Sequence, residues 1–121
     1  MKILLIVGAV LAALAVTIGA FGAHGLKSRL SPEDLVIFEI GVRYHMYHSI
    51  AVLLLGIIGY FIPHSLISPV ALLMIAGIII FSGSLYILVL SGQRWLGAIT
   101  PIGGTFFIVS WILLLIRLRG A

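Results

Sequence analysis

Apolar residues along this 121-residue chain fall into four long runs that short polar stretches separate. The runs cover approximately residues 3–23, 32–62, 69–90 and 99–117. About 20 apolar helical residues cross a hydrocarbon core of about 30 Å, because each residue adds about 1.5 Å. The pattern therefore predicts an all-α, integral membrane four-helix bundle, built as a single membrane domain over residues 1–121.

A hydroxyl residue followed by proline marks each of the last three predicted helix starts. These pairs are Ser31-Pro32, Ser68-Pro69 and Thr100-Pro101. The hydroxyl is suited to capping the helix, and proline fits the first turn, where its missing N–H costs nothing. At the end of the first helix, Gly25 is suited to a left-handed cap.

The second run is too long for a bilayer. A helix over residues 32–62 would extend about 46 Å. We therefore expect its first turns to lie in or beyond the headgroup region, or to bend near Gly41 into a segment along the surface.

The first run also has features of a secretory signal peptide, with a basic residue at Lys2 and a tolerable cleavage site at Ala20-Phe21-Gly22. Its apolar stretch of about 20 residues exceeds the 7–15 that are usual for such a signal. We therefore interpret it as a transmembrane helix.

Composition agrees with a membrane protein, since 63% of residues are apolar and 8% are charged. Soluble domains contain about 45–50% apolar residues and about 25% charged residues. The net charge of +4 comes from basic residues near helix ends, where they anchor to headgroups, so nucleic acid is not an expected partner. The chain has no cysteine, which excludes disulfides and thiolate ligands.

Small residues recur at the spacing of helix–helix contacts. Ala15, Gly19 and Ala23 are four residues apart on the first helix, a pattern that lets two helix backbones approach closely. Gly83, Gly103 and Gly104 are predicted to serve the same purpose on the third and fourth helices. Such contacts can lie within the bundle or between copies of the chain, and the sequence leaves both open.

Polar side chains gather at one depth of the predicted bundle. Four spans place both termini and the loop at 63–68 on one side, side A, and the loops at 24–31 and 91–98 on the other, side B. All four helices bring polar residues towards side B, and these form the candidate ligand or partner site: His24, Glu39, Arg43, Tyr44, Tyr47, His48, Ser82, Ser84, Tyr86 and Thr100.

Ionisable groups at membrane depth usually face the bundle interior or a wet cavity and have partners. Glu39 and Arg43 are four residues apart, so we expect them to pair along the helix. The alternative is that the cluster only fastens the side-B rim of a packed bundle, because Arg, Tyr and His near a helix end are ordinary interfacial anchors.

Histidines in the same region raise the alternative of a metal site. His45 and His48 are three apart, and His24 could approach from the first helix. No cysteine assists, and the nearest carboxylate, Glu39, has Arg43 as a competing partner. The sequence therefore predicts no metal, no cofactor and no catalytic residues.

The orientation of the chain in the membrane is weakly determined, because the two sides carry similar numbers of basic residues. Side A carries Lys2, Arg117 and Arg119, and side B carries Lys27, Arg29 and Arg94. The side-B residues are accompanied by an acidic helix start, so we expect a multi-pass protein of the plasma (inner) membrane with both termini in the cytoplasm.

Four motifs in order give the chain a specific resemblance. They are Gly19-Ala20-Phe21-Gly22-Ala23-His24-Gly25-Leu26, Tyr44 with Met46-Tyr47-His48, Phe81-Ser82-Gly83-Ser84-Leu85-Tyr86, and Thr100-Pro101-Ile102-Gly103-Gly104 followed by Trp111. This pattern resembles the YgdD/YwdK-like family of small inner-membrane proteins. The resemblance implies a four-helix integral membrane protein with no established activity and no catalytic residues. His45 stands where the family pattern usually has Gln, which weakens a metal role for it.

Three functions remain open at this point. The first is a non-enzymatic accessory or scaffold subunit, with the lipid bilayer and a larger membrane complex or a homo-oligomer as partners. The second is a binding or transport unit for a lipid headgroup, quinone or small solute at the polar cluster. The third is a membrane enzyme or redox carrier with histidine ligands.

Overall fold

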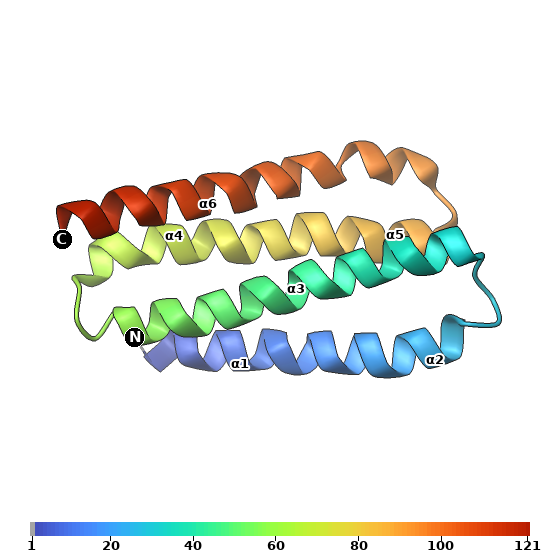
Figure 1. The fold of residues 1–121 in the computed structure, drawn as a ribbon, viewed down its shortest axis with the longest axis horizontal. Coiled ribbons are helices and arrows are strands. Elements are labelled where there is room, and N and C mark those ends of the chain that lie inside the picture. The colour runs from blue at the N-terminus through green and yellow to red at the C-terminus, as the bar shows by residue number, and fades with distance from the viewer. Residues whose placement is uncertain (1) are drawn as a thin grey trace.

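A computed structural model describes residues 2–121, and its four long apolar helices confirm the predicted all-α membrane bundle (Figure 1). The first helix joins α1 (Lys2–Thr17), the π-helical segment η1 (Ile18–Gly22) and α2 (Ala23–Leu26). The second is α3 (Pro32–Ile58). The third joins α4 (His64–Gly77), the π-helical segment η2 (Ile78–Ser82) and α5 (Gly83–Ser91). The fourth joins the 3₁₀ segment η3 (Arg94–Ala98) and α6 (Thr100–Gly120).

Consecutive helices run antiparallel and lie side by side, in the order α1, α3, α4 and α6 across the view of Figure 1. Each helix packs mainly against its neighbours in the sequence, so α3 and the third helix are central, whereas α1 and α6 are outer. Both ends of the chain and the loop before α4 lie at one end of the bundle, which is side A. The loops before α3 and before η3 lie at the other end, side B (Figure 1).

The helix starts follow the sequence only in part. Ser31 caps α3 as predicted, since its Oγ accepts a hydrogen bond from the Asp34 N–H at 3.1 Å. The predicted start at Ser68-Pro69 is wrong, because α4 begins five residues earlier, after Pro63, and Pro69 lies inside the helix. Thr100 begins α6 without capping it through its side chain.

The predicted left-handed cap at Gly25 is also wrong, because the helix continues through this residue to Leu26. Among residues 2–121 the one positive φ, 75°, belongs to Gly92, which ends α5. The second helix is continuous through Gly41 and ends at Ile58, so neither a bend nor an extension to residue 62 occurs.

The apolar core has two parts. The part towards side A joins α1, α3, α4 and α6 through residues such as Leu4, Val52, Met74 and Leu114. The part towards side B is smaller and centres on Phe38. The polar side chains of the candidate site lie at the middle of the bundle and towards side B, next to these two parts.

Candidate functional site

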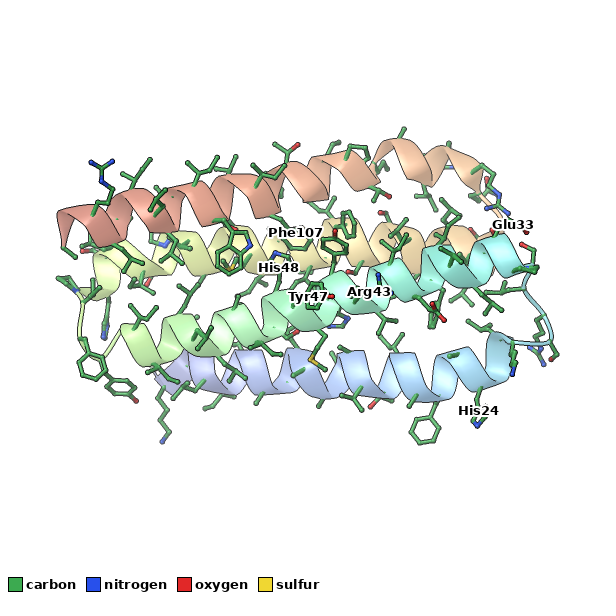
Figure 2. All side chains as sticks on the ribbon, viewed as in Figure 1. His24, Glu33, Arg43, Tyr47, His48 and Phe107 are labelled. Atoms are coloured by element: carbon green, nitrogen blue, oxygen red, sulfur yellow. The ribbon has the colours of Figure 1, made fainter. Side chains whose placement is uncertain are left out.

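The polar residues of α3 lie closer to the middle of the bundle than the sequence suggests. The helix has 27 residues, so it is about 40 Å long and its middle residue is His45. The sequence places the first turns of this helix in or beyond the headgroup region, which puts the cluster near side B. With the end at Ile58, His45 and His48 lie at mid-span, and Figure 2 shows Arg43, Tyr47, His48 and Phe107 in the middle part of the bundle.

His48 is held by α6 and by its own helix. The Trp111 Nε1–H donates to His48 Nε2 at 3.0 Å, and His48 Nδ1 lies 2.8 Å from the Tyr44 carbonyl oxygen. The indole can only donate and the carbonyl can only accept, so His48 is neutral with its proton on Nδ1. Its ring stacks on Phe107 at a centroid distance of 3.6 Å. Both ring nitrogens are therefore used inside the protein.

A second network joins α3 to the third helix on another side of α3. The His45 Nδ1 and the Tyr86 hydroxyl lie 2.9 Å apart, and the Ser82 Oγ–H donates to the Gly41 carbonyl at 2.6 Å. The ring of Tyr86 lies directly against Gly41, where a Cβ would meet it at 2.9 Å. His45 Nε2 is the one buried side-chain nitrogen or oxygen among residues 2–121 that has no hydrogen-bond partner.

A third polar contact lies closer to side B. The hydroxyls of Ser84 and Thr100 are 2.6 Å apart, and Thr100 also donates to the Leu96 carbonyl at 3.3 Å. This pair joins α5 to the start of α6. Among residues 2–121 the Ser84–Thr100 pair shares no hydrogen bond with the His48 network, so the predicted cluster divides into separate contacts of α3 with α6, of α3 with the third helix, and of α5 with α6.

Glu39 and Arg43 do not form the predicted ion pair. Within residues 2–121 the one ion pair joins Arg94 to Asp34, with two hydrogen bonds of 2.8 and 2.9 Å at the side-B end. Both Glu39 and Arg43 are exposed on α3 instead. Arg43 and Glu39 lie about 17 Å and about 10 Å from the start of this helix of about 40 Å, so both charges fall within a hydrocarbon core of about 30 Å that is centred on the bundle.

His24 does not join the other candidates. It is exposed on α2, and Figure 2 shows its side chain on the outer side of the first helix, away from α3. His24 therefore does not approach His45 and His48, although the sequence leaves that approach open. Among the described residues no three His, Cys, Asp or Glu side chains are placed to hold a metal ion.

One face of α3 is open along the whole helix, and we name it the α3 face. Its exposed or half-exposed side chains are Val36, Glu39, Ile40, Arg43, Tyr47, Ile50, Leu54 and Ile57. The exposed fraction is 56% at Val36 and still 49% at Ile57. The α3 face therefore presents a strip of apolar side chains in which two charges of opposite sign are set.

Beside the α3 face lies a groove of about 620 Å³ between α3 and α6. Aromatic rings line much of it, from Tyr44, Phe81, Phe107 and Trp111, and Arg43 borders it. Tyr44 packs against Phe81 with a centroid distance of 5.0 Å. The groove can hold an apolar chain or ring. The Trp111 indole N–H that borders it is already bonded to the His48 imidazole.

The residues predicted for helix packing lie mostly at contacts. Ala15 is fully buried, Ala23 packs against the core part near Phe38, and Gly19, Gly103 and Gly104 face side chains or backbone of the adjacent helix. Gly83 is the exception, because a Cβ there would meet nothing within 4 Å. It directly follows η2, and a π-helical turn shifts the register of the residues after it relative to a straight α-helix.

The sequence reading missed Trp111, Phe107 and His45 as members of these networks. Trp111 carries an N–H that seeks a partner when it lies at membrane depth, and that was the available signal. His45 was discounted because the family pattern has another residue there. Phe107 gave no signal, since an aromatic residue in an apolar run is ordinary.

The sequence is similar to a family of bacterial membrane proteins. The family model described as "Protein of unknown function (DUF423)" matches residues 18–104. A UPF0382 membrane protein of Staphylococcus aureus (strain bovine RF122) is 48% identical over 116 residues, which cover 96% of this chain and 94% of the relative. The UPF0382 membrane protein YwdK of Bacillus subtilis (strain 168) is 44% identical over 117 residues, covering 96% and 95%. No solved structure matches the chain.

Proposed function

This chain belongs to the DUF423 family of proteins of unknown function, and we propose that it is a non-enzymatic assembly subunit that associates with protein through the α3 face. The resemblance to YwdK-like membrane proteins that the four motifs indicate is confirmed by these relatives. The family carries no established activity from which a reaction could be taken.

The observation that carries the proposal is the exposure of Glu39 and Arg43 at hydrocarbon depth without an ion pair between them. Charged side chains in membrane spans usually face a bundle interior or pair with one another. Arg or Asp at the centre of a span costs about 2.5–3.5 kcal/mol even on the mildest scale. A protein partner with complementary charges would remove that cost, whereas lipid tails offer no hydrogen bond.

The state of the histidines supports a role without catalysis. Both nitrogens of His48 are occupied by Trp111 and Tyr44, so this side chain is not free to move a proton or to bind a metal. His45 is buried beside Tyr86. Neither histidine is placed as a free base beside a nucleophile or proton donor.

Native mass spectrometry after gentle extraction tests the proposal. We expect the wild-type chain to travel in a larger protein complex, and the Glu39→Leu/Arg43→Leu variant to travel as a single chain with unchanged helix content. Thr105→Leu is the matched control, because it also replaces an exposed polar residue, but on α6. A wild-type chain that is always single would refute the proposal.

A second candidate function is favoured by the aromatic groove between α3 and α6, which fits a lipid or quinone-like amphiphile. Trp111 borders the groove and reports on it once Trp95→Phe removes the other tryptophan. Binding predicts saturable quenching of Trp111 fluorescence by a brominated lipid. The same titration of Trp111→Phe, which leaves Trp95 at side B, should show only unsaturable quenching.

We further propose that the chain lies in the plasma (inner) membrane with both termini in the cytoplasm. The cysteine-free chain supports a clean test with single reporters at Ser28→Cys on side B and Gly120→Cys on side A. An impermeant maleimide added to intact cells should label Ser28→Cys alone. Labelling of Gly120→Cys alone would reverse the orientation.

A further inference from the structure

We propose that the partner at the α3 face is a second copy of this chain, inserted in the same direction, with Arg43 of each copy paired to Glu39 of the other. This inference rests on the proposed assembly function and names its partner. It is carried by the two charges, by their spacing along α3, and by the shape of the surface around them.

The signs of the charges favour a second copy. An anionic ligand would satisfy Arg43 but would meet Glu39 one helical turn away, which repels it. A cationic ligand would satisfy Glu39 but would be repelled by Arg43. A second copy presents both signs in the same arrangement, so one two-fold axis would satisfy all four charges.

The order of residues along the α3 face suits a second helix. Val36, Ile40, Arg43, Tyr47, Ile50, Leu54 and Ile57 follow one another at intervals of three and four. This is the spacing of a helix–helix seam. It extends over about 32 Å, which is the full hydrocarbon thickness. The outer helices α1 and α6 are also exposed at mid-span, but they carry no charge there.

The depths of the charges select the parallel arrangement. With two copies inserted in the same direction, Arg43 of one copy lies about 6 Å below Glu39 of the other, a step that a long side chain covers by extending towards side B. In an antiparallel pair centred on His45 the same two residues would be about 12 Å apart along the axis, which is too far.

The surface beside the α3 face leaves room for interdigitation. On one side, Gly19, Phe38 and Arg43 border a hollow of about 270 Å³ between η1 and α3. On the other side lies the groove towards α6. Side chains of a second helix can enter both, as ridges enter grooves in packed helices.

Disulfide cross-linking in the membrane tests the inference, because the chain has no native cysteine. Ile50→Cys lies on the α3 face, and Ile112→Cys is its matched control at similar depth on α6, with 47% and 52% of the native side chains exposed. Oxidation by copper–phenanthroline should convert Ile50→Cys to a disulfide-linked dimer of this chain and leave Ile112→Cys monomeric. Equal yields at the two positions would overturn the inference.

Charge reversal tests the pairing itself. In the Ile50→Cys background, Glu39→Arg should lower the dimer yield roughly tenfold, and the exchanged variant Glu39→Arg/Arg43→Glu should restore it. A failure to restore, in a variant with native helix content, would overturn the pairing. Cross-linking of Ile50→Cys to a different protein would overturn the second copy but leave the proposed assembly function standing. No protein adduct at all would overturn both.

Discussion

At the scale of single residues, several polar groups in the middle of the bundle are stabilised by a specific partner on another helix. His48 is the clearest case, since the Trp111 indole and the Tyr44 carbonyl fix its tautomer and Phe107 covers one ring face. A buried polar group left without its partner costs about 1–3 kcal/mol. These pairs therefore specify which helix faces meet, a choice that the apolar residues around them make weakly.

Replacing the indole should expose this cost. Trp111→Phe keeps an aromatic ring in the groove but leaves His48 Nε2 without its donor, so we expect a loss of about 1 kcal/mol in the free energy of unfolding. Unfolding by denaturing detergent measures it. Trp95→Phe is the control, because Trp95 is exposed on η3 and its indole donates to the nearby Gln93 side chain, so its removal should change little. Equal losses in the two variants would contradict the assignment.

Two glycines that the sequence treats alike should respond in opposite ways. A Cβ on Gly103 would overlap the backbone of Phe81, whereas the space beside Gly83 is open. We expect Gly103→Ala to destabilise the fold by about 1–3 kcal/mol, because backbone cannot move aside as a flexible side chain can. Gly83→Ala should be neutral or stabilising, since alanine favours helix. The same unfolding measurement compares both, and a stable Gly103→Ala variant would refute the close approach.

At the scale of elements, the sequence predicts the number and type of helices well and their ends less well. Apolar length alone specifies the four spans. The ends depend on tertiary contacts, as the third helix shows. Pro69 cannot donate to the Ser65 carbonyl one turn earlier, which is why a helix start was expected there. Arg117 of α6 donates to that carbonyl at 3.2 Å instead, and the helix extends back to His64.

This exchange of donors predicts coupling between the two residues. Arg117→Met should cost about 1 kcal/mol of unfolding free energy in the wild-type chain, because the Ser65 carbonyl loses its donor. In a Pro69→Ala background the restored Ala N–H can replace the guanidinium, so the same substitution should cost less. A double-mutant cycle on unfolding free energies measures the difference, and Arg119→Met serves as an exposed control. A coupling energy of zero would contradict the account.

At the scale of the whole molecule, the sequence reveals the depth of each polar residue better than the direction in which it points. When nearly every position is apolar, hydropathy has little helical periodicity, so the faces that meet cannot be read from it. His24, His48 and Thr100 thus shared a candidate site by approximate depth, although the structure turns His24 outward and gives the other two separate partners.

The arrangement of α1, α3, α4 and α6 in order makes the contact between α1 and α3 separate from the one between α3 and α6. Val42 packs against Gly19 of the first helix, and Trp111 binds His48 on another side of α3. We expect the unfolding costs of Val42→Ala and Trp111→Phe to add within about 0.5 kcal/mol, as they do for sites without shared partners. Trp111→Phe combined with His48→Leu should cost less than the sum, because either change alone already breaks the same hydrogen bond. Strong coupling between Val42 and Trp111 would instead mean that the contacts on the two sides of α3 rearrange together, and that the bundle responds as one closed core.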